Sequence, residues 1–528
     1  MGNDLLAGMA IAEVITLILA LFALFRQWEN TLAESGAYAI VVSMMSFSFL
    51  FQSGFMPGLR YPALVSELLV FLAGARLIFN QRVRLAADLQ NFLNFAREHR
   101  VASVVVSMVL CYLAARAIFV PPAAYHWNRL MPVLHCQLSN GFPPTTPTAG
   151  TLLPLYPINA AVLSHLVLRF NTDTGLGIFG FLAYLSIGFS TYALARRYAW
   201  PPTAYTAVLI VLSMPRFVYQ ASSPGGEIIP AASALFCILA LYRLIEAPSI
   251  RDLFVLIAGI FFSLTEDAAC FILPAILFIL ASIMLFRRHG ASVWWHIIRR
   301  NKLVTVSVVV PVLVFSQFWL FAHNIFKGEK WIGAPAFTAF AYNNDGIQGA
   351  LANFFRYLFQ VADLTRPVDT AFQIFGTLTF TEILLGLYNA SAGSLFGNLG
   401  ATAPFTLSSI PDEMVAWFGP AGFLLVPAAF LYVLFRGPRR LKATAIALGI
   451  YLYALCLVAA WNPTNVRYFS IFFACTGFFT AFFLPPWRLT TTGKTILQVV
   501  AIFLLIYATI IRVHQPPIGL QEILRTLY

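Results

Sequence analysis

Long apolar runs recur along almost the whole of the 528-residue chain, and they constrain its fold more than any other feature. About fourteen of them approach the roughly 20 residues that an α-helix needs to cross the hydrocarbon core of a bilayer. A further run near 370–388 would add a span or a re-entrant pair, so we expect roughly 12 to 16 membrane helices. The fourteen runs lie near residues 5–25, 37–51, 61–79, 101–120, 175–194, 203–219, 228–245, 253–264, 268–286, 303–322, 417–435, 443–460, 468–484 and 496–512.

The composition agrees with this interpretation. Only 10% of the residues are charged and 60% are hydrophobic, whereas a soluble domain carries roughly 25% charged residues. We therefore predict an all-α, polytopic integral membrane protein, which excludes cytosolic enzymes, secreted disulfide scaffolds and disordered tails.

The first apolar run is preceded by an acidic rather than a basic residue and is followed by no small-residue cleavage site. We therefore expect a retained helix rather than a signal peptide. The six cysteines show no C-x-x-C spacing, so we expect packing residues rather than a disulfide framework or a zinc site.

Basic residues indicate the orientation of the helices. The chain has 33 Lys and Arg against 21 Asp and Glu, a net charge of +12. In a membrane protein this excess follows the positive-inside bias of cytoplasmic loops, so we expect no nucleic-acid partner. If the arginines near 82–100 mark a cytoplasmic loop, the alternation of the runs brings the other basic clusters to the same side. These are Arg196 and Arg197; Arg243 and Arg251; Arg287, Arg288, Arg299, Arg300 and Lys302; Arg436, Arg439, Arg440 and Lys442; and Arg488 with Lys494.

The same alternation places the longest loops, about 121–174 and 327–414, on the outer side, with the tail after residue 512. It requires residues 152–169 to form a surface helix there rather than a span. The outer loops are rich in aromatic and apolar residues, so we expect them to be ordered and packed on the outer surface. The stretch 81–100 is rich in Arg, Leu and Phe, which predicts an amphipathic helix on the inner surface.

Polar residues that look out of place in apolar sequence fall on the outer side under this topology. Ionisable groups in or near a membrane are costly and therefore suggest a functional site. The alternative is that they are ordinary helix-end residues, solvated or reaching to the interface. We predict that the charged members of the set, with His126, line one cavity at the membrane interface. The set consists of Tyr125, His126, Arg129, Glu227, Glu266, Asp267, Arg467 and Tyr468.

Several of these residues belong to motifs with a family resemblance. The segments YHWNR at 125–129, NG at 140–141, PPT at 143–145 and LYP at 155–157 resemble the first periplasmic loop of bacterial GT-C membrane glycosyltransferases, of the protein-mannosyltransferase and aminoarabinose-transferase type. The stretch from Met214-Pro215 through Glu227 to Leu241 and the closing Arg467-Tyr468 are further matches. The resemblance covers most of the chain from about residue 101. It implies a GT-C-like transmembrane domain over 101–528, preceded by additional transmembrane helices and the amphipathic segment in 1–100.

The resemblance also implies a function. Such proteins transfer a sugar from a polyprenyl-phosphate-linked donor to an acceptor at the periplasmic face of the bacterial inner membrane. The reaction needs a general base and cationic groups for the leaving phosphate, and it can use a divalent metal ion held by carboxylates. On this basis Glu227 or His126 would act as base, and Arg129, Arg467 and Tyr468 would bind the donor phosphate. Glu266, Asp267 and Tyr125 would bind a metal ion or the acceptor.

Two departures from the family pattern leave other functions open. Family members have an Asp shortly before the position of Tyr125, where this chain has Pro121-Pro122-Ala123-Ala124, and relatives often have Gly and Lys where it has residues 263–267. The first alternative is a GT-C-like scaffold without catalysis, acting as a subunit or lipid-binding partner in a membrane complex. The second is a lipid-linked saccharide transporter, which we disfavour because the charges cluster at one interface and no repeated halves are apparent.

Overall fold

The computed structural model describes residues 2–528 except 29, 57–59, 99, 139–158, 225–227, 265–270, 327–341, 363–368, 370–371, 376–377, 408–417, 486–490, 511–517 and 528. The described chain is a bundle of α-helices with two isolated β-bridges and no strand. Ten of its described helices are long and apolar enough to cross a membrane, so the chain is a multi-pass membrane protein. They are α1 (Gly2–Gln27), α2 (Leu32–Gly54), α3 (Arg60–Asn80), α5 (Arg100–Phe119), α8 (Ile178–Ala195), α11 (Ile228–Glu246), α13 (Ile272–His289), α22 (Gly419–Arg436), α23 (Arg439–Val458) and α26 (Thr491–Ile510).

The other four apolar runs form shorter or broken helices. The run near 203–219 is divided where Pro215 starts a new helix, and the run near 303–322 is divided beside Gln317, which has a φ of 58°. The run near 253–264 forms one 15-residue helix, and that near 468–484 forms two short ones. The elements are α9 (Pro201–Leu212), α10 (Pro215–Gln220), α12 (Ile250–Leu264), α15 (Lys302–Phe315), α16 (Trp319–Phe326), α24 (Phe469–Gly477) and α25 (Phe479–Phe483).

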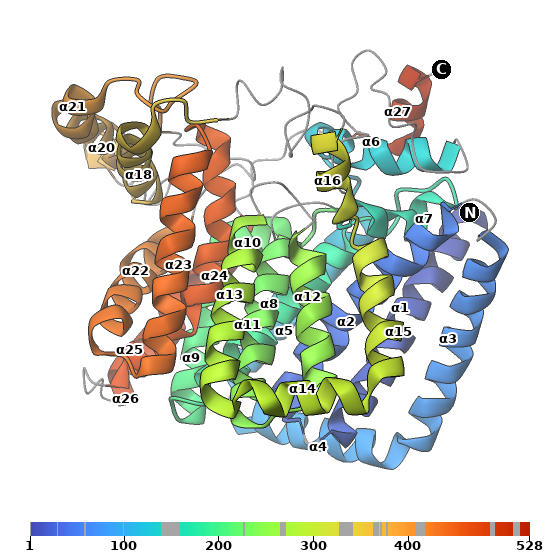
Figure 1. Cartoon of the computed structure of the whole chain (residues 1–528). Helices are drawn as coiled ribbons and strands as arrows, with labels where there is room; N and C mark the ends of the chain where they lie inside the picture. The colour runs from blue at the N-terminus through green and yellow to red at the C-terminus, as the bar shows by residue number, and fades with distance from the viewer. Residues whose placement is uncertain are drawn as a thin grey trace.

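The bundle has two distinct ends (Figure 1). At the lower end of that view, α4 (Arg82–Glu98) and α14 (Ala291–Arg300) lie across the bundle. At the upper end lie both chain termini with α6 (Ala124–Leu138), α18 (Gly346–Val361), α20 (Phe380–Tyr388), α21 (Ser394–Phe396) and α27 (Leu520–Leu527). The amphipathic helix expected near 81–100 is therefore present as α4. With nine residues, α20 is too short to be the additional span considered near 370–388.

Side-chain contacts show that the basic helix ends meet at the lower end. Arg26 at the end of α1 forms a bidentate ion pair with Asp88 on α4, with both N–O distances at 2.9 Å. His289 Nε2 at the end of α13 lies 2.8 Å from the Leu244 carbonyl oxygen near the end of α11. Tyr242 on α11 shares a hydrogen bond of 3.0 Å with Thr444 on α23. The ends of α1, α11 and α13 and the start of α23 thus share one end of the bundle.

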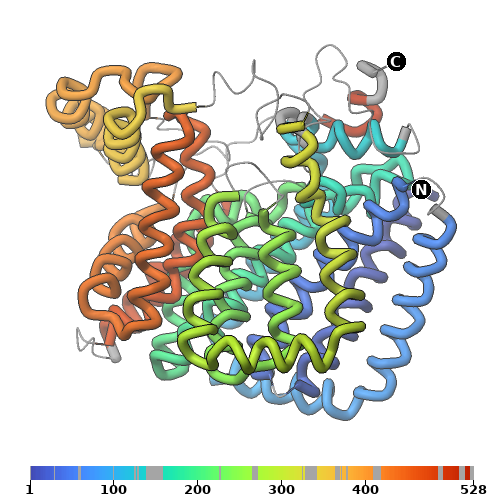
Figure 2. Tube along the Cα trace, viewed as in Figure 1, coloured from blue at the N-terminus to red at the C-terminus, as the bar shows by residue number. Residues whose placement is uncertain are grey.

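The centre of the bundle is α11, which is buried along nearly its whole length and packs on α8, α12, α13 and α24. Helix α2 is also largely buried and packs on α8, α11, α12 and α15. The Cα trace in Figure 2 shows the first helices on one side of the bundle and most of the C-terminal helices on the other, with α27 back beside the N-terminus. Through α2, the segment before residue 101 shares a core with the rest of the chain.

Two glycines bring the chain after α10 close to the start of α8. A Cβ atom at Gly180 would lie 2.4 Å from the Ser223 carbonyl oxygen, and one at Gly177 would lie 2.7 Å from the Ser222 carbonyl oxygen. Only glycine allows backbones to approach this closely. The residues at 222–223 are thereby fixed against the upper end of α8.

The described part of the 327–414 segment is mostly helical and packed, as expected for an ordered outer loop. The Asn343 amide donates to the Val458 carbonyl at 3.0 Å, and the Trp461 amide donates to the Gly400 carbonyl at 2.8 Å. Both contacts attach the segment to the upper end of α23. Of the surface helix expected at 152–169, the structure shows two short turns, η2 (Ala161–Ser164) and α7 (His165–Leu168).

Candidate functional site

His126 is the best-defined of the predicted site residues. It lies in the first turn of α6 and is only 4% exposed. Its Nε2 atom is 2.8 Å from the Ser223 hydroxyl, and the tautomer decides which of the two atoms donates. The neighbouring Trp127 donates from Nε1 to the Ile518 carbonyl at 2.8 Å, so the C-terminal segment holds α6 onto the bundle. His126 therefore links α6 to the chain that follows α10.

Arg216 is a buried cation at the same end that the sequence interpretation missed. It follows Pro215 in the first turn of α10 and is 1% exposed. Its Nε atom donates to the Ser470 hydroxyl on α24 at 3.4 Å. The sequence signal was an Arg in an apolar run directly after the Met214-Pro215 motif. Its burial depends on α10 packing inside the bundle, which the local sequence does not show.

Arg467 and Tyr468 lie beside this contact. They close a 3-10 turn, η5 (Pro463–Tyr468), that leads into α24. The Arg467 guanidinium donates to the Tyr468 hydroxyl at 2.9 Å and lies 4.9 Å from the centre of its ring. Ser470 is three residues after Arg467, close to the spacing at which helical residues share a face. Arg216 thus contacts the start of α24, and Arg467 lies in the turn directly before that helix.

A buried tyrosine packs against the start of α24. Tyr357 on α18 is fully buried, and its ring centre lies 4.8 Å from that of Phe469. Burial holds the pKa of the Tyr357 phenol well above its usual range, so the phenol is neutral. The segment with α18 thus covers the start of α24 from above.

The other predicted site residues are placed only in part. Glu227, Glu266 and Asp267 lie outside the described residues, as do the side chains of Tyr125 and Arg129 on α6. The described helices next to those carboxylates are α11, which begins at Ile228, and α12, which ends at Leu264. Among the described residues, no group of three or more His, Cys, Asp and Glu has the arrangement of a metal site. The structure therefore brings His126, Arg467 and Tyr468 to one end and leaves the shared cavity a prediction.

A second polar cluster lies between the N-terminal helices and was not predicted. Arg169 forms a bidentate pair with Glu67 on α3, with N–O distances of 2.6 and 2.8 Å, and lies 3.9 Å from Glu13 on α1. Glu67, Arg169 and His165 line a cavity of about 340 Å³. Cys136 also lines it, and burial raises the pKa of this thiol to about 12, so it is not a thiolate nucleophile.

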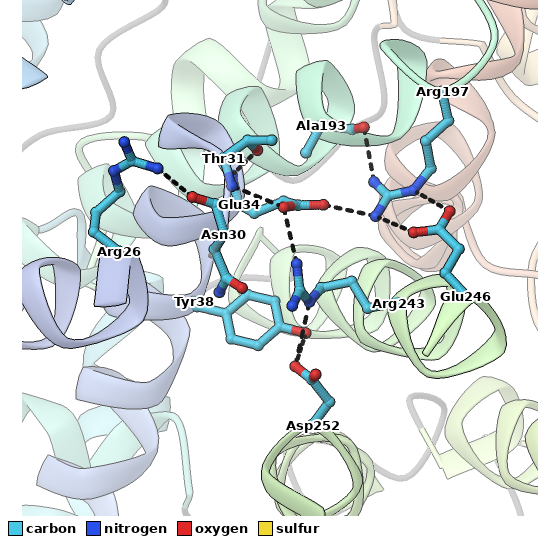
Figure 3. A network of polar contacts seen from close by, with 10 residues as sticks. All are labelled: Arg26, Asn30, Thr31, Glu34, Tyr38, Ala193, Arg197, Arg243, Glu246 and Asp252. Atoms are coloured by element: carbon cyan, nitrogen blue, oxygen red, sulfur yellow. Dashed lines mark hydrogen bonds and ion pairs between the residues drawn. The ribbon is translucent and has the colours of Figure 1, made fainter. Parts of the chain in front are cut away.

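A third cluster forms a buried ion network at the lower end (Figure 3). Glu34 at the start of α2 contacts Arg197 at 2.6 Å and Arg243 at 3.0 Å, and Arg243 also reaches Asp252. The Tyr38 hydroxyl donates to Asp252 at 2.9 Å. Our expectation that charges cluster at one interface is therefore wrong, because this network lies at the opposite end of the bundle. Its acidic residues are far apart in the sequence and meet their arginine partners only in the folded bundle. This expectation was one of two reasons for disfavouring a transporter.

Comparison with family models, curated proteins and solved structures found no match to this chain. The geometry of the site and the motifs in the sequence therefore carry the functional argument.

Proposed function

We propose that this protein is a glycosyltransferase of the bacterial inner membrane that moves a sugar from a polyprenyl-phosphate-linked donor to an acceptor at the upper end. In this proposal the upper end faces the periplasm and the basic lower end faces the cytoplasm. One observation carries the proposal: buried Arg216 donates to Ser470, and Arg467 lies three residues before Ser470 in the turn that leads into α24, at the same end as His126. A guanidinium presents a planar fork of donors that matches a phosphate group.

The chemistry needs a base and a cationic site. The acceptor hydroxyl oxygen attacks the anomeric carbon of the donor, and the bond from this carbon to the phosphate oxygen breaks. A base takes the hydroxyl proton, and the polyprenyl phosphate leaves with the bonding electron pair. We assign the base to Glu227 or His126 and the neutralisation of the leaving phosphate to Arg467 with Tyr468. Buried Arg216 adds positive potential behind this site.

An assay with purified protein in proteoliposomes tests the proposal. Polyprenyl-phosphate mannose and polyprenyl-phosphate aminoarabinose serve as labelled donors, with a membrane extract as the source of acceptor. Arg467→Gln should lower transfer by about 100-fold because it removes a charge that acts on the developing phosphate. Arg439→Gln, which removes an exposed charge at the first residue of α23, is the matched control and should retain parental activity. Equal activity of the two variants would contradict the assignment of Arg467.

A scaffold without catalysis is the second candidate. Two observations favour it: Pro121-Pro122-Ala123-Ala124 contains no carboxylate where relatives have Asp, and His126 is only 4% exposed. A scaffold of this kind would bind a polyprenyl phosphate and release no sugar. Donor binding that depends on Arg467, with no turnover of either donor, would establish this second function and exclude the first.

A further inference from the structure

A lateral groove opens on the lower half of the bundle, away from the upper-end site. It has a volume of about 670 Å³ and lies between α12, α13 and α14. This volume is within the range of about 300–1,000 Å³ found for ligand pockets. Its walls are formed mainly by aliphatic and aromatic side chains, among them Leu256, Ile260, Phe278, Leu285 and Trp295. Ser282 is one of two serines in the lining, and its hydroxyl already donates to the Phe278 carbonyl at 2.9 Å. The groove therefore suits hydrocarbon.

The floor of the groove is a fixed part of the fold. Gly290, with a φ of 80°, turns the chain from α13 into α14, which lies across the lower end (Figure 1). Trp294 is 4% exposed, and its Nε1 donates to the Leu285 carbonyl at 3.4 Å. The Trp294 ring lies edge-on to His289, at a centre distance of 5.8 Å. The groove thus exists before any ligand arrives.

The groove is open on the side that faces the bilayer. Phe278 is 50% exposed, Phe286 is 52% exposed and Trp295 is 67% exposed. Tryptophan is enriched where hydrocarbon meets lipid head groups. Trp295 therefore marks the level of the head groups, and the groove above it lies at the depth of the acyl chains.

Cationic residues directly follow two lining residues of the groove, Phe286 and Ile298, in the sequence. The segment 287–302, which ends α13 and forms α14, contains no Asp or Glu. Its arginines and lysine are exposed, and none forms an ion pair within the part of the chain that the structure describes. These five cations are Arg287, Arg288, Arg299, Arg300 and Lys302. The groove therefore combines an apolar wall with unpaired cations at head-group level.

We propose that this groove binds an anionic phospholipid, with one acyl chain between α12 and α13 and the phosphate beside the arginines of α13 and α14. Basic pockets between membrane helices on the cytoplasmic side recognise anionic head groups in this way. The charge complementarity selects a lipid over an uncharged apolar partner. The bound lipid fastens α14 across the lower end and does not depend on the proposed transfer of sugar.

Fluorescence quenching of Trp295 measures this binding in the full-length protein. The parent is reconstituted in nanodiscs of phosphatidylcholine with increasing phosphatidylglycerol, one of the two lipids carrying brominated acyl chains that quench nearby tryptophan. The difference between the parent and Trp295→Phe isolates the signal of Trp295. We expect the parent to prefer phosphatidylglycerol by at least about five-fold, as one or more cations acting on the phosphate would give.

Two independent changes separate the chain site from the head-group site. Ser282→Phe fills the groove and should reduce quenching by both lipids, whereas Ile279→Phe on the lipid-facing side of α13, outside the groove lining, should not.

The head-group site is tested by removing charge. Replacing Arg287, Arg288, Arg299 and Arg300 by Gln should abolish the preference for phosphatidylglycerol. The matched control replaces Arg436, Arg439, Arg440 and Lys442 by Gln and should keep it. Equal quenching by the two lipids in the parent, or equal loss in both four-charge variants, would overturn the proposal.

Discussion

Glu34 illustrates at the scale of one residue how a side chain can serve two purposes. It completes a capping box with Thr31, whose amide donates to Glu34 Oε2 at 3.0 Å. The same carboxylate bridges Arg197 and Arg243 (Figure 3). The capping pattern is local and can be recognised in the sequence. Arg197 lies just after α8 and Arg243 lies on α11, so the bridging role can be recognised only in the fold.

Glu34→Gln should lower the free energy of unfolding by about 3 kcal/mol, because two poorly exposed arginines lose their shared anion. Thermal unfolding in detergent measures the change. Glu246→Gln is the matched control, because Glu246 also pairs with Arg197 but its side chain is 46% exposed. An exposed pair contributes less than about 1 kcal/mol. Parental unfolding temperatures for both variants would show that the network adds no stability.

Glu227→Gln should reduce sugar transfer by about 100-fold if Glu227 is the base, because the amide cannot accept the hydroxyl proton. Glu227 directly precedes α11, and a carboxylate at a helix N-terminus is stabilised as the anion by about 0.3–1 kcal/mol. Glu382→Gln, in the first turn of α20, is a control with the same chemical change. Full activity in Glu227→Gln would assign the base to another residue.

At the scale of elements, one buried arginine organises the segment above α23. Arg356 on α18 is fully buried and donates to the carbonyl oxygens of Gly397 and Leu399, both at 2.6 Å. It also donates to the Tyr388 hydroxyl at 3.1 Å. These bonds join α18 to the end of α20 and to the residues after α21. The arginine therefore holds α18, α20 and α21 together as one unit. This unit contacts the start of α24 through Tyr357.

Arg356→Met should loosen this unit while the membrane helices stay folded, because the buried carbonyl groups lose their donors. We expect hydrogen exchange of residues 380–405 to become at least about 10-fold faster, as the loss of roughly 1.4 kcal/mol of local stability would give. Gln348→Met changes an exposed residue of the same helix and should leave exchange unchanged. Unchanged exchange in Arg356→Met would contradict the structural role of Arg356.

At the scale of the whole molecule, periodic apolar runs and basic clusters were enough to predict the helical membrane fold and its charged end. They failed where tertiary packing decides. The pairing of Arg169 with Glu13 and Glu67 follows from α1 packing on α3, and the burial of Arg216 follows from the place of α10 in the bundle. An isolated ionisable residue in an apolar run has the same local pattern whether it reaches solvent or pairs inside. The sequence therefore singled out His126, Arg467 and Tyr468 as candidates but not the buried Arg216.

Labelling of introduced cysteines tests the orientation of the whole molecule. In a Cys111→Ser background, Asn398→Cys at the upper end should react with a membrane-impermeant maleimide in cells with a permeabilised outer membrane and an intact inner membrane. Arg439→Cys at the lower end should react only after the inner membrane is disrupted, because basic helix ends stay in the cytoplasm. The opposite pattern would invert the orientation and place the proposed site in the cytoplasm.

The location of a bound polyprenyl phosphate tests the central claim most directly. An experimental structure of the full chain in nanodiscs with saturating polyprenyl phosphate should show the phosphate at the upper end. A phosphate oxygen should lie within about 3 Å of an Arg467 guanidinium nitrogen, the length of a charge-assisted hydrogen bond. Phosphate found only beside α14, or at no position near Arg467, would contradict a donor site at the upper end and with it the proposed transfer reaction.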